Sequence, residues 1–415
     1  MTADGGVPAM FAALRIPSYR RFYVGQFSVQ VGVWLTMIAS ALLVYDRTES
    51  AAALGLLTVC QFLPLLALGS WAGVIADRND KRRVLIAMTV LGKANSAVLG
   101  IYVVAGGRSL VPVYVLAVVW GVALAFESPP RRTFVAETVP VPLVANAIGL
   151  YSAMMVTARI LGPALAGLLI SVSGYGACFL LDAATGIVLL AALVRIDPAT
   201  LRRSERVVKG KGQVREGLRY LRSVPELWMV LVMTTIIGVL AYNFTVVFPP
   251  YVEDTLRGDH TAFTLLFSTM SVGALLGALW TSRRGRVEAR DLVVSAVCFG
   301  AALALLTVAP NLAFAYVVSV GLGISSNLFF TMGSTIVQVE AAPAMQGRVI
   351  ALHSLVTFGS TPVGGLFLGL VCDTLGSRVA MGIGAVAAVV AAGIGSSMAR
   401  RATPPLVTVS PGVTG

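Results

Sequence analysis

Ionisable side chains next to or inside long apolar stretches are the feature of this sequence that can do chemistry. A charge in such surroundings is costly unless it is paired or faces water. Glu127, Arg159 and Asp182 stand in this position. A carboxylate there can take up and release a proton, and a guanidinium can bind an anionic group. The alternatives are an ion pair of Glu127 with Arg131 or Arg132, and a structural pair of Arg159 with Asp182.

The elements that must position these residues are helices that cross a membrane. Hydrophobic residues make up 57% of the 415 positions and charged residues 12%, which excludes a soluble globular domain. An apolar run of about 20 residues spans a bilayer as a helix. Twelve such segments are predicted, at 22–45, 51–74, 84–105, 111–129, 143–170, 176–194, 226–249, 261–281, 291–309, 312–333, 349–370 and 377–398. The fold class is therefore an all-α membrane protein with twelve transmembrane helices.

The positive charges lie almost entirely on one side of this topology. Of the 31 Lys and Arg residues, 25 fall in the N-terminal arm, the even-numbered connections and the tail, and 4 in the odd-numbered connections. The other two, Lys93 and Arg159, lie within helices, where Lys93 is expected to snorkel or to form a structural pair. Cationic loops stay cytoplasmic, so both termini are predicted to be cytoplasmic. Contact with anionic lipid headgroups explains the net charge of +12, and no nucleic-acid partner is predicted.

The chain divides into two halves that resemble each other. Gly162-Pro163 in the fifth segment has a counterpart in Thr361-Pro362 of the eleventh. Such symmetry is typical of transporters made of two six-helix bundles, with the substrate site at their interface. Within the linker, 214–221 is either a short amphipathic helix or a flexible tether. The predicted parts are an arm at 1–21, bundles at 22–194 and 226–398, a basic linker at 195–225 and a tail at 399–415.

Uncharged polar residues within the predicted helices could bind an amphipathic substrate through hydrogen bonds, or could simply pack. They are Gln26, Gln30, Asn243 and Asn327. The four cysteines are scattered, without the spacing of a metal site. The sequence has no P-loop for ATP and no D-D-x-x-D run for a metal-bound diphosphate. No cofactor and no metal are therefore predicted, and an integral-membrane lipid-modifying enzyme is a remote alternative.

The short connection between the second and third segments carries small and charged residues in a fixed order: Gly73, Asp77, Arg78, Lys81, Arg82 and Arg83. This order resembles the signature of the major facilitator superfamily, except that Asp80 stands where a second Gly is usual. The resemblance implies the major facilitator fold and a conformational latch at Asp77 and Arg78. Gly73 would allow two helices to approach closely. Asp77 could accept from free N–H groups at a helix start or pair with an Arg of the other bundle.

The stretch from Arg159 through Gly162-Pro163 to Gly167 resembles the helix 5 motif of drug/proton antiporters of this superfamily, which marks exporters. Three further segments resemble the branch of the superfamily that contains the enterobactin exporter and macrolide efflux proteins. They are Arg21–Ser28, Tyr45–Ser50 and Ala145–Ala147. Two departures leave the proton route open. The first is the lack of an acid at Gly32-Val33-Trp34, and the second is Ala117 where an Arg is expected.

The resemblance implies a secondary active exporter of small amphipathic compounds, of drug or siderophore type, in a bacterial plasma membrane. It would work as a monomer by alternating access and proton antiport. Import or uniport of a small metabolite is the alternative. For an exporter, the predicted gating residues are Gly73, Asp77, Arg78 and Arg82, and Gly162-Pro163 is expected to prevent leak of solutes or protons through the transporter. Glu127, Arg159 and Asp182 are the candidates for coupling or for binding substrate charge.

Overall fold

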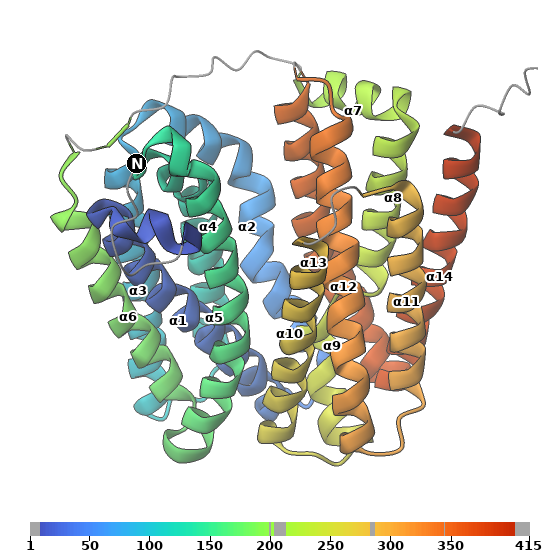
Figure 1. Cartoon of the computed structure of the whole chain (residues 1–415). Coiled ribbons are helices and arrows are strands. Elements are labelled where there is room, and N and C mark those ends of the chain that lie inside the picture. The colour runs from blue at the N-terminus through green and yellow to red at the C-terminus, as the bar shows by residue number, and fades with distance from the viewer. Residues whose placement is uncertain (1–8, 199–200, 203–212, 283–286, 344, 403–415) are drawn as a thin grey trace, which may run out of the picture.

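The computed structural model describes residues 9–198, 201–202, 213–282, 287–343 and 345–402. Twelve helices in this part of the chain are long and apolar enough to cross a membrane, which confirms the predicted fold class. They form two bundles that stand side by side (Figure 1). The first bundle consists of η1 (Ala9–Arg15), α1 (Pro17–Thr48), α2 (Ala51–Arg78), α3 (Lys81–Val104), α4 (Val111–Glu137), η2 (Val141–Leu143), α5 (Val144–Ser173) and α6 (Tyr175–Arg195).

The second bundle follows a short helix in the linker, α7 (Gln213–Ser223). Its first span is not continuous, because the chain leaves the helical path at 241–243 and then resumes it. The prediction of one unbroken helix at 226–249 is therefore wrong. The elements are α8 (Pro225–Leu240), α9 (Phe244–Pro250), the π-helical turn η4 (Tyr251–Thr255), α10 (His260–Ser282), α11 (Ala289–Thr307), α12 (Leu312–Glu340), α13 (Gln346–Leu375) and α14 (Ser377–Ala402).

Several helices run beyond the apolar segments that predicted them. The prediction ended the second helix at 74, the fourth at 129 and the tenth at 333, whereas α2, α4 and α12 end at Arg78, Glu137 and Glu340. An apolar run marks the hydrocarbon layer, and a helix can continue into water with polar residues. Pro129 and Pro130 lie inside α4, so these prolines do not end it. Glu127 therefore lies within a helix and not at its end.

The linker helix α7 confirms the helical alternative for 214–221. It is held against the second bundle by an ion pair of Glu216 with Arg348 at 2.8 Å. In addition, the Tyr220 hydroxyl accepts from the Ala342 N–H at 2.9 Å. Residues 199–200 and 203–212 of the predicted linker lie outside the described residues, as do 1–8 of the arm and 403–415 of the tail.

The two ends of the molecule differ in how the bundles meet. We call the end with α7 and the α2–α3 connection the basic end, and the end where α1 meets α2 the opposite end. At the opposite end, the Asp373 carboxylate of α13 accepts from the backbone N–H groups of Ala51 and Ala52, at 2.6 and 3.1 Å. It thus caps the first turn of α2, a favourable place for an anion. The Tyr45 hydroxyl also donates to Asp254 across the bundles, at 2.6 Å.

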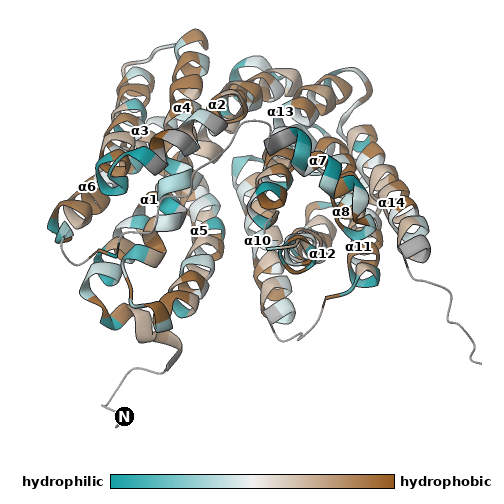
Figure 2. Cartoon of the chain, turned by 90° about the horizontal axis from the view of Figure 1, so that it is seen from above, coloured by the Kyte–Doolittle hydropathy of each residue, from teal (hydrophilic) through white to brown (hydrophobic). Residues whose placement is uncertain are grey.

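From the opposite end the ribbons of the two bundles diverge toward the basic end, which is uppermost in Figure 1. Seen from the basic end, α2 lies beside α13 and α5 beside α10, while α11 and α14 lie on the side away from the first bundle (Figure 2). The helices that meet at the interface are therefore α1, α2 and α5 of the first bundle and α9, α10 and α13 of the second.

Close packing inside the second bundle depends on a glycine of α12. A Cβ added to Gly323 would lie 1.8 Å from the Met270 carbonyl oxygen of α10, a backbone atom that cannot rotate away. Gly321, two residues earlier, has no atom within 4 Å of such a Cβ. We expect Gly323→Ala to destabilise the protein by about 1–3 kcal/mol, seen as a lower thermal unfolding midpoint in detergent. Gly321→Ala should be neutral or stabilising by up to about 1 kcal/mol. Equal midpoints for the two variants would contradict this packing.

Candidate functional site

The break between α8 and α9 brings a tyrosine to the arginine of the first bundle. Tyr242 lies in the break, and its hydroxyl accepts from the Arg159 Nη2 of α5 at 3.1 Å. The Arg159 guanidinium also lies over the ring of Trp34 on α1, 5.7 Å from the ring centroid, which is cation–π distance. The Arg159 Nε is buried and has no hydrogen-bond partner. Arg159 therefore keeps donor capacity that a ligand could use.

Aromatic rings surround this contact from both bundles. Tyr242 packs edge-on against Phe330 of α12, with ring centroids 4.5 Å apart, and against Phe244 at 5.1 Å. Trp34 packs against Phe267 of α10 at 5.9 Å. We call Arg159, Tyr242, Trp34 and Phe330 the interface site. One cation among aromatic walls can bind an amphipathic molecule that carries a negative or hydrogen-bond-accepting group.

The predicted gating residue Gly162 makes room for one of these walls. A Cβ on Gly162 would lie 2.2 Å from the Trp34 Cβ, whereas a Cβ on Gly149, also in α5, would meet no atom within 4 Å. Gly162→Ala should therefore displace Trp34 from beneath Arg159, and a strain of about 1–3 kcal/mol would weaken ligand binding at the interface site by about 5- to 150-fold. Substrate binding to the purified variants measures this effect. Gly149→Ala should bind like the wild type, and equal losses in both variants would contradict the role of Gly162.

A second group of charged residues lies inside the first bundle, away from the interface. The Lys93 ammonium of α3 donates to the Asp182 Oδ1 of α6 in an ion pair. Ser96 Oγ donates to Asp182 Oδ2 at 2.6 Å. The side chains of Lys93 and Asp182 are only 11% and 2% exposed. Lys93 thus forms a structural pair, and the alternative pairing of Arg159 with Asp182 is wrong because each has another partner.

The Asp182 carboxylate fills a space that α1 leaves open. A Cβ on Gly32 of α1 would lie 2.1 Å from Asp182 Oδ1. The helix 1 stretch that lacks an acid in the sequence therefore packs directly against a carboxylate from α6. The acid is present at this place in the fold, although another helix supplies it.

A cavity of about 90 Å³ extends from this ion pair to Glu127 and Arg131 of α4. Gln30, Thr89 and Trp120 are among the residues that line it. Glu127 accepts from Arg131 at 3.2 Å, and both side chains are mostly buried, at 14% and 12% exposed. The ion pair of Glu127 with Arg131 is therefore confirmed, and Glu127 also lines this cavity. We call this space the N-bundle cavity.

Buried polar atoms without partners lie in the same bundle. Gln26 is 0% exposed, and neither its amide nitrogen nor its amide oxygen has a hydrogen-bond partner. The Thr89 hydroxyl, on the cavity wall, also has none. Buried polar groups are normally satisfied by protein or by water, and the cavity has room for several water molecules. Of these two residues, only Thr89 lines the N-bundle cavity.

The two predicted site asparagines, Asn243 and Asn327, have different environments. Asn243 is 2% exposed, and its Nδ2 donates to the carbonyl oxygens of Gly238 and Val239, both at 3.1 Å. It thus satisfies the last turn of α8 at the break, while its Oδ1 has no partner. Asn327 accepts from the Thr331 hydroxyl at 3.3 Å within α12.

Comparison with known proteins identifies the family. A family model described as "Transmembrane secretion effector", within the major facilitator superfamily, matches residues 8–405. The chain belongs to this family. Macrolide efflux protein A of Streptococcus pyogenes is 23% identical over 371 residues, which cover 86% of this chain and 92% of that protein. The multidrug efflux pump Tap of Mycobacterium tuberculosis is 27% identical over 363 residues, covering 83% and 84%.

The staphyloferrin A transporter of Staphylococcus aureus is 23% identical over 362 residues, covering 86% and 89%. The fold matches solved structures as well. One is a bacterial homologue of the human lysosomal transporter Spinster, with a TM-score of 0.68, 16% identity and coverage of 95% of this chain and 98% of that one. The protein is therefore a major facilitator transporter and not an enzyme.

The superfamily signature between α2 and α3 is only partly described. Gly73 is buried and Arg78 is exposed, and the side chain of Asp77 lies outside the described residues. Asp80 caps the N-terminus of α3, because its Oδ1 accepts from the Arg83 N–H at 3.2 Å. Arg82 donates to the carbonyl oxygens of Leu193 and Val194, at 2.6 and 2.8 Å, and so satisfies the end of α6 within its own bundle.

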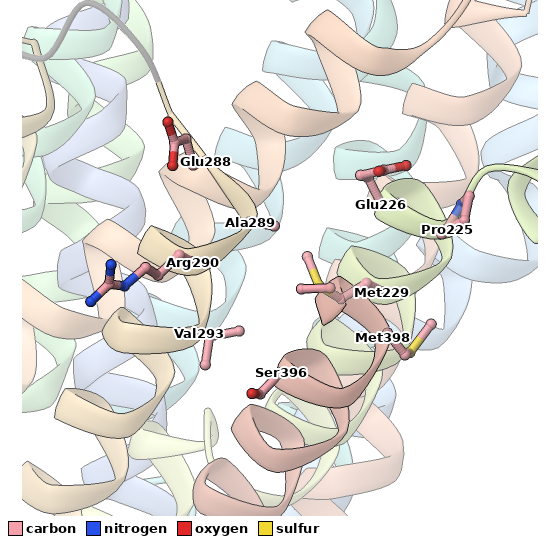
Figure 3. Close-up of a pocket in the computed structure, with 10 residues that line it drawn as sticks. Pro225, Glu226, Met229, Glu288, Ala289, Arg290, Val293, Ser396 and Met398 are labelled. Atoms are coloured by element: carbon pink, nitrogen blue, oxygen red, sulfur yellow. The ribbon is translucent and has the colours of Figure 1, made fainter. Parts of the chain in front are cut away.

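A larger hollow of about 480 Å³ lies at the basic end of the transporter, between α8, α11 and α14 (Figure 3). Glu226, Met229, Glu288 and Arg290 are among its lining residues. All three helices belong to the second bundle, and α11 and α14 lie on the side away from the first (Figure 2). This hollow is therefore separate from the interface site.

Sequence reasoning missed Ser96 and the packing role of Gly32, and it predicted a pair for Lys93 without naming Asp182 as the partner. One signal was present, because Lys93 and Ser96 are three residues apart and so share one face of a helix. Gly32 gave no signal by itself, since nothing in the sequence indicates which helix packs against it.

Proposed function

We propose that this transporter exports small amphipathic compounds from the cytoplasm by alternating access, in exchange for protons. The basic end is cytoplasmic in this proposal, as the distribution of Lys and Arg predicts, and the membrane is a bacterial plasma membrane. The names of the relatives, a macrolide efflux protein, a multidrug efflux pump and a staphyloferrin A transporter, favour export of drugs or siderophores.

Alternating access is supported by the unequal ends of the molecule. The Asp373 cap and the Tyr45–Asp254 hydrogen bond join the bundles at the opposite end, and the bundles diverge toward the basic end. With the basic end in the cytoplasm, these two contacts hold the bundles together on the outer side. The outward-open state then requires these two contacts to break, which supplies a discrete change between two states.

The interface site is the proposed substrate site. Its position at the helix break between the bundles is typical of transporter binding sites. Arg159 would bind the polar or negative group of the substrate, and the rings of Trp34, Tyr242 and Phe330 would contact its apolar part.

The observation that carries proton coupling is the buried Lys93–Asp182 pair beside the N-bundle cavity. Asp182 would accept the proton. Protonation removes the negative charge that compensates Lys93, so the packing of α1, α3 and α6 would have two arrangements with different energies. Glu127, on the same cavity and nearer the basic end, would pass the proton between Asp182 and the cytoplasm through water.

Transport into everted membrane vesicles tests this function. A panel of dyes, macrolides and catecholate siderophores is offered with and without a protonophore. Accumulation that collapses with the protonophore supports proton-driven export. Accumulation that ignores the protonophore contradicts proton coupling, and accumulation only in right-side-out vesicles contradicts export and favours the import alternative. Asp77→Asn tests the latch that the signature implies, and it should reduce accumulation without preventing substrate binding.

A further inference from the structure

A cluster of metal-ligating side chains joins the two bundles at the opposite end. Asp46 lies near the end of α1, Glu253 lies in η4, and His260 begins α10. One ligand atom from each of these residues lies within 4.8 Å of the other two. We propose that Asp46, Glu253 and His260 bind a divalent transition metal ion such as Zn²⁺, and that the metal holds this end of the transporter closed.

The spacing of the His260 and Asp46 donor atoms fits zinc. His260 Nε2 lies 3.3 Å from Asp46 Oδ2. Two ligands of a tetrahedral zinc ion, each about 2.0–2.2 Å from the metal, are about 3.4 Å apart. The other ring nitrogen, His260 Nδ1, lies 3.2 Å from Glu253 Oε1. One imidazole binds an ion through one nitrogen only, so the carboxylate that faces the other nitrogen has to turn to join the same ion, and the three ligand atoms already lie within 4.8 Å of one another.

The cluster is accessible and its surroundings are negative. The side chains of His260, Asp46 and Glu253 are 37%, 27% and 23% exposed, so a hydrated ion can reach them. Asp254, next to Glu253, adds another acid at the same end. The nearby Arg47 guanidinium is engaged with the carbonyl oxygens of Gly107 and Arg108, at 2.8 and 3.1 Å. Arg47 keeps its positive charge, but the three acids Asp46, Glu253 and Asp254 outnumber it, so a cation is electrostatically favoured here.

A tyrosine completes the cluster. The Tyr175 hydroxyl, at the start of α6, donates to Asp46 Oδ2 and lies 3.2 Å from His260 Nε2. Metal binding at this nitrogen requires the hydroxyl to turn toward the second oxygen of Asp46 or toward water. The phenol thus marks the position that the metal would take between the two bundles.

The ligands come from both bundles, with Asp46 in the first and Glu253 and His260 in the second. Opening of this end separates them, so the metal can bind with all three ligands only in the closed arrangement. A ligand that binds one state stabilises that state. Metal binding itself is independent of the transport direction, whereas its effect on transport rests on the alternating access proposed above.

The direct test is titration of the purified full-length protein with ZnCl₂ by isothermal calorimetry, using an affinity tag without histidine. We expect one saturable site, and we expect Asp46→Asn and His260→Ala each to weaken its affinity by about tenfold or more. Glu253→Gln is the further variant if either of these fails to fold. The matched control is His353→Ala, which removes the second of the two histidines and should leave the affinity unchanged. Mg²⁺ should not compete, because it prefers octahedral oxygen ligands.

The absence of saturable zinc binding, or an affinity that is the same in wild type and in both variants, would overturn the proposal and leave the cluster as a hydrogen-bonded contact only. The gating part has its own test in proteoliposomes with zinc on both sides. Zinc should slow substrate counterflow in the wild type and not in His260→Ala. Zinc that binds without slowing counterflow would overturn closure by the metal. A protein without any counterflow would contradict the proposed transport function and leave the calorimetric result standing.

Discussion

Asp182→Asn is expected to lose protonophore-sensitive accumulation of substrate and to be markedly less stable. The substitution leaves the Lys93 ammonium in the bundle interior without its anionic partner. Removing one partner of a buried pair costs about 3–5 kcal/mol. The measurements are substrate uptake into everted vesicles and the thermal unfolding midpoint of the purified protein.

Loss of stability alone could explain loss of uptake, so the double variant Lys93→Met, Asp182→Asn is the decisive control. Replacing a whole buried pair by neutral side chains is often neutral or stabilising. The double variant should therefore regain the unfolding midpoint and perform substrate counterflow, which needs no net proton movement. It should still fail to accumulate substrate against a gradient. Wild-type accumulation by the double variant would show that Asp182 is not the coupling group.

Arg159→Gln is expected to weaken the binding of substrates that carry a negative group by about 10 to 150-fold. This range corresponds to the loss of hydrogen bonds to a charged group, each contributing about 1.5–3 kcal/mol. The guanidinium also loses its position over Trp34 and its bond to Tyr242. Equilibrium binding of an anionic substrate to the purified variant gives the affinity directly, and a neutral analogue should be affected much less.

Tyr242→Phe separates the role of the hydroxyl from the role of the ring. It removes the acceptor for Arg159 and keeps the contacts with Phe330 and Phe244, so a smaller loss of about fivefold to tenfold is expected. Tyr102→Phe is the matched control, because the Tyr102 hydroxyl only donates to the Ser109 carbonyl oxygen at the end of α3. An effect of Tyr102→Phe as large as that of Tyr242→Phe would contradict the interface site.

The architecture of this protein could be predicted from the sequence because the bilayer imposes a local rule. Each span must satisfy its own backbone hydrogen bonds and be apolar over about 20 residues, so composition alone reveals twelve helices. The signature at Gly73, Asp77 and Arg78 then implied the family, and the family model confirmed it. The ends of α2, α4 and α12 were predicted too short, because hydropathy reports the hydrocarbon layer and not the helix.

The partners of the charged residues were decided only by the tertiary structure. Lys93 and Asp182 are 89 positions apart, and a sequence of apolar helices does not state which faces meet. Arg159 could therefore be assigned to Asp182 from the sequence, although in the fold it reaches Tyr242 of the other bundle. The break at 241–243 contains no proline that would have predicted it.

The sequence by itself thus determined the class of protein and its helices, since burial in lipid acts on each segment separately. The interface site, the N-bundle cavity and the cluster of Asp46, Glu253 and His260 depend on how helices from distant segments pack. Only the tertiary structure decided them. Helices in membranes pack through small residues and polar contacts, and each helix has several faces that carry such residues, so one sequence does not show which face packs.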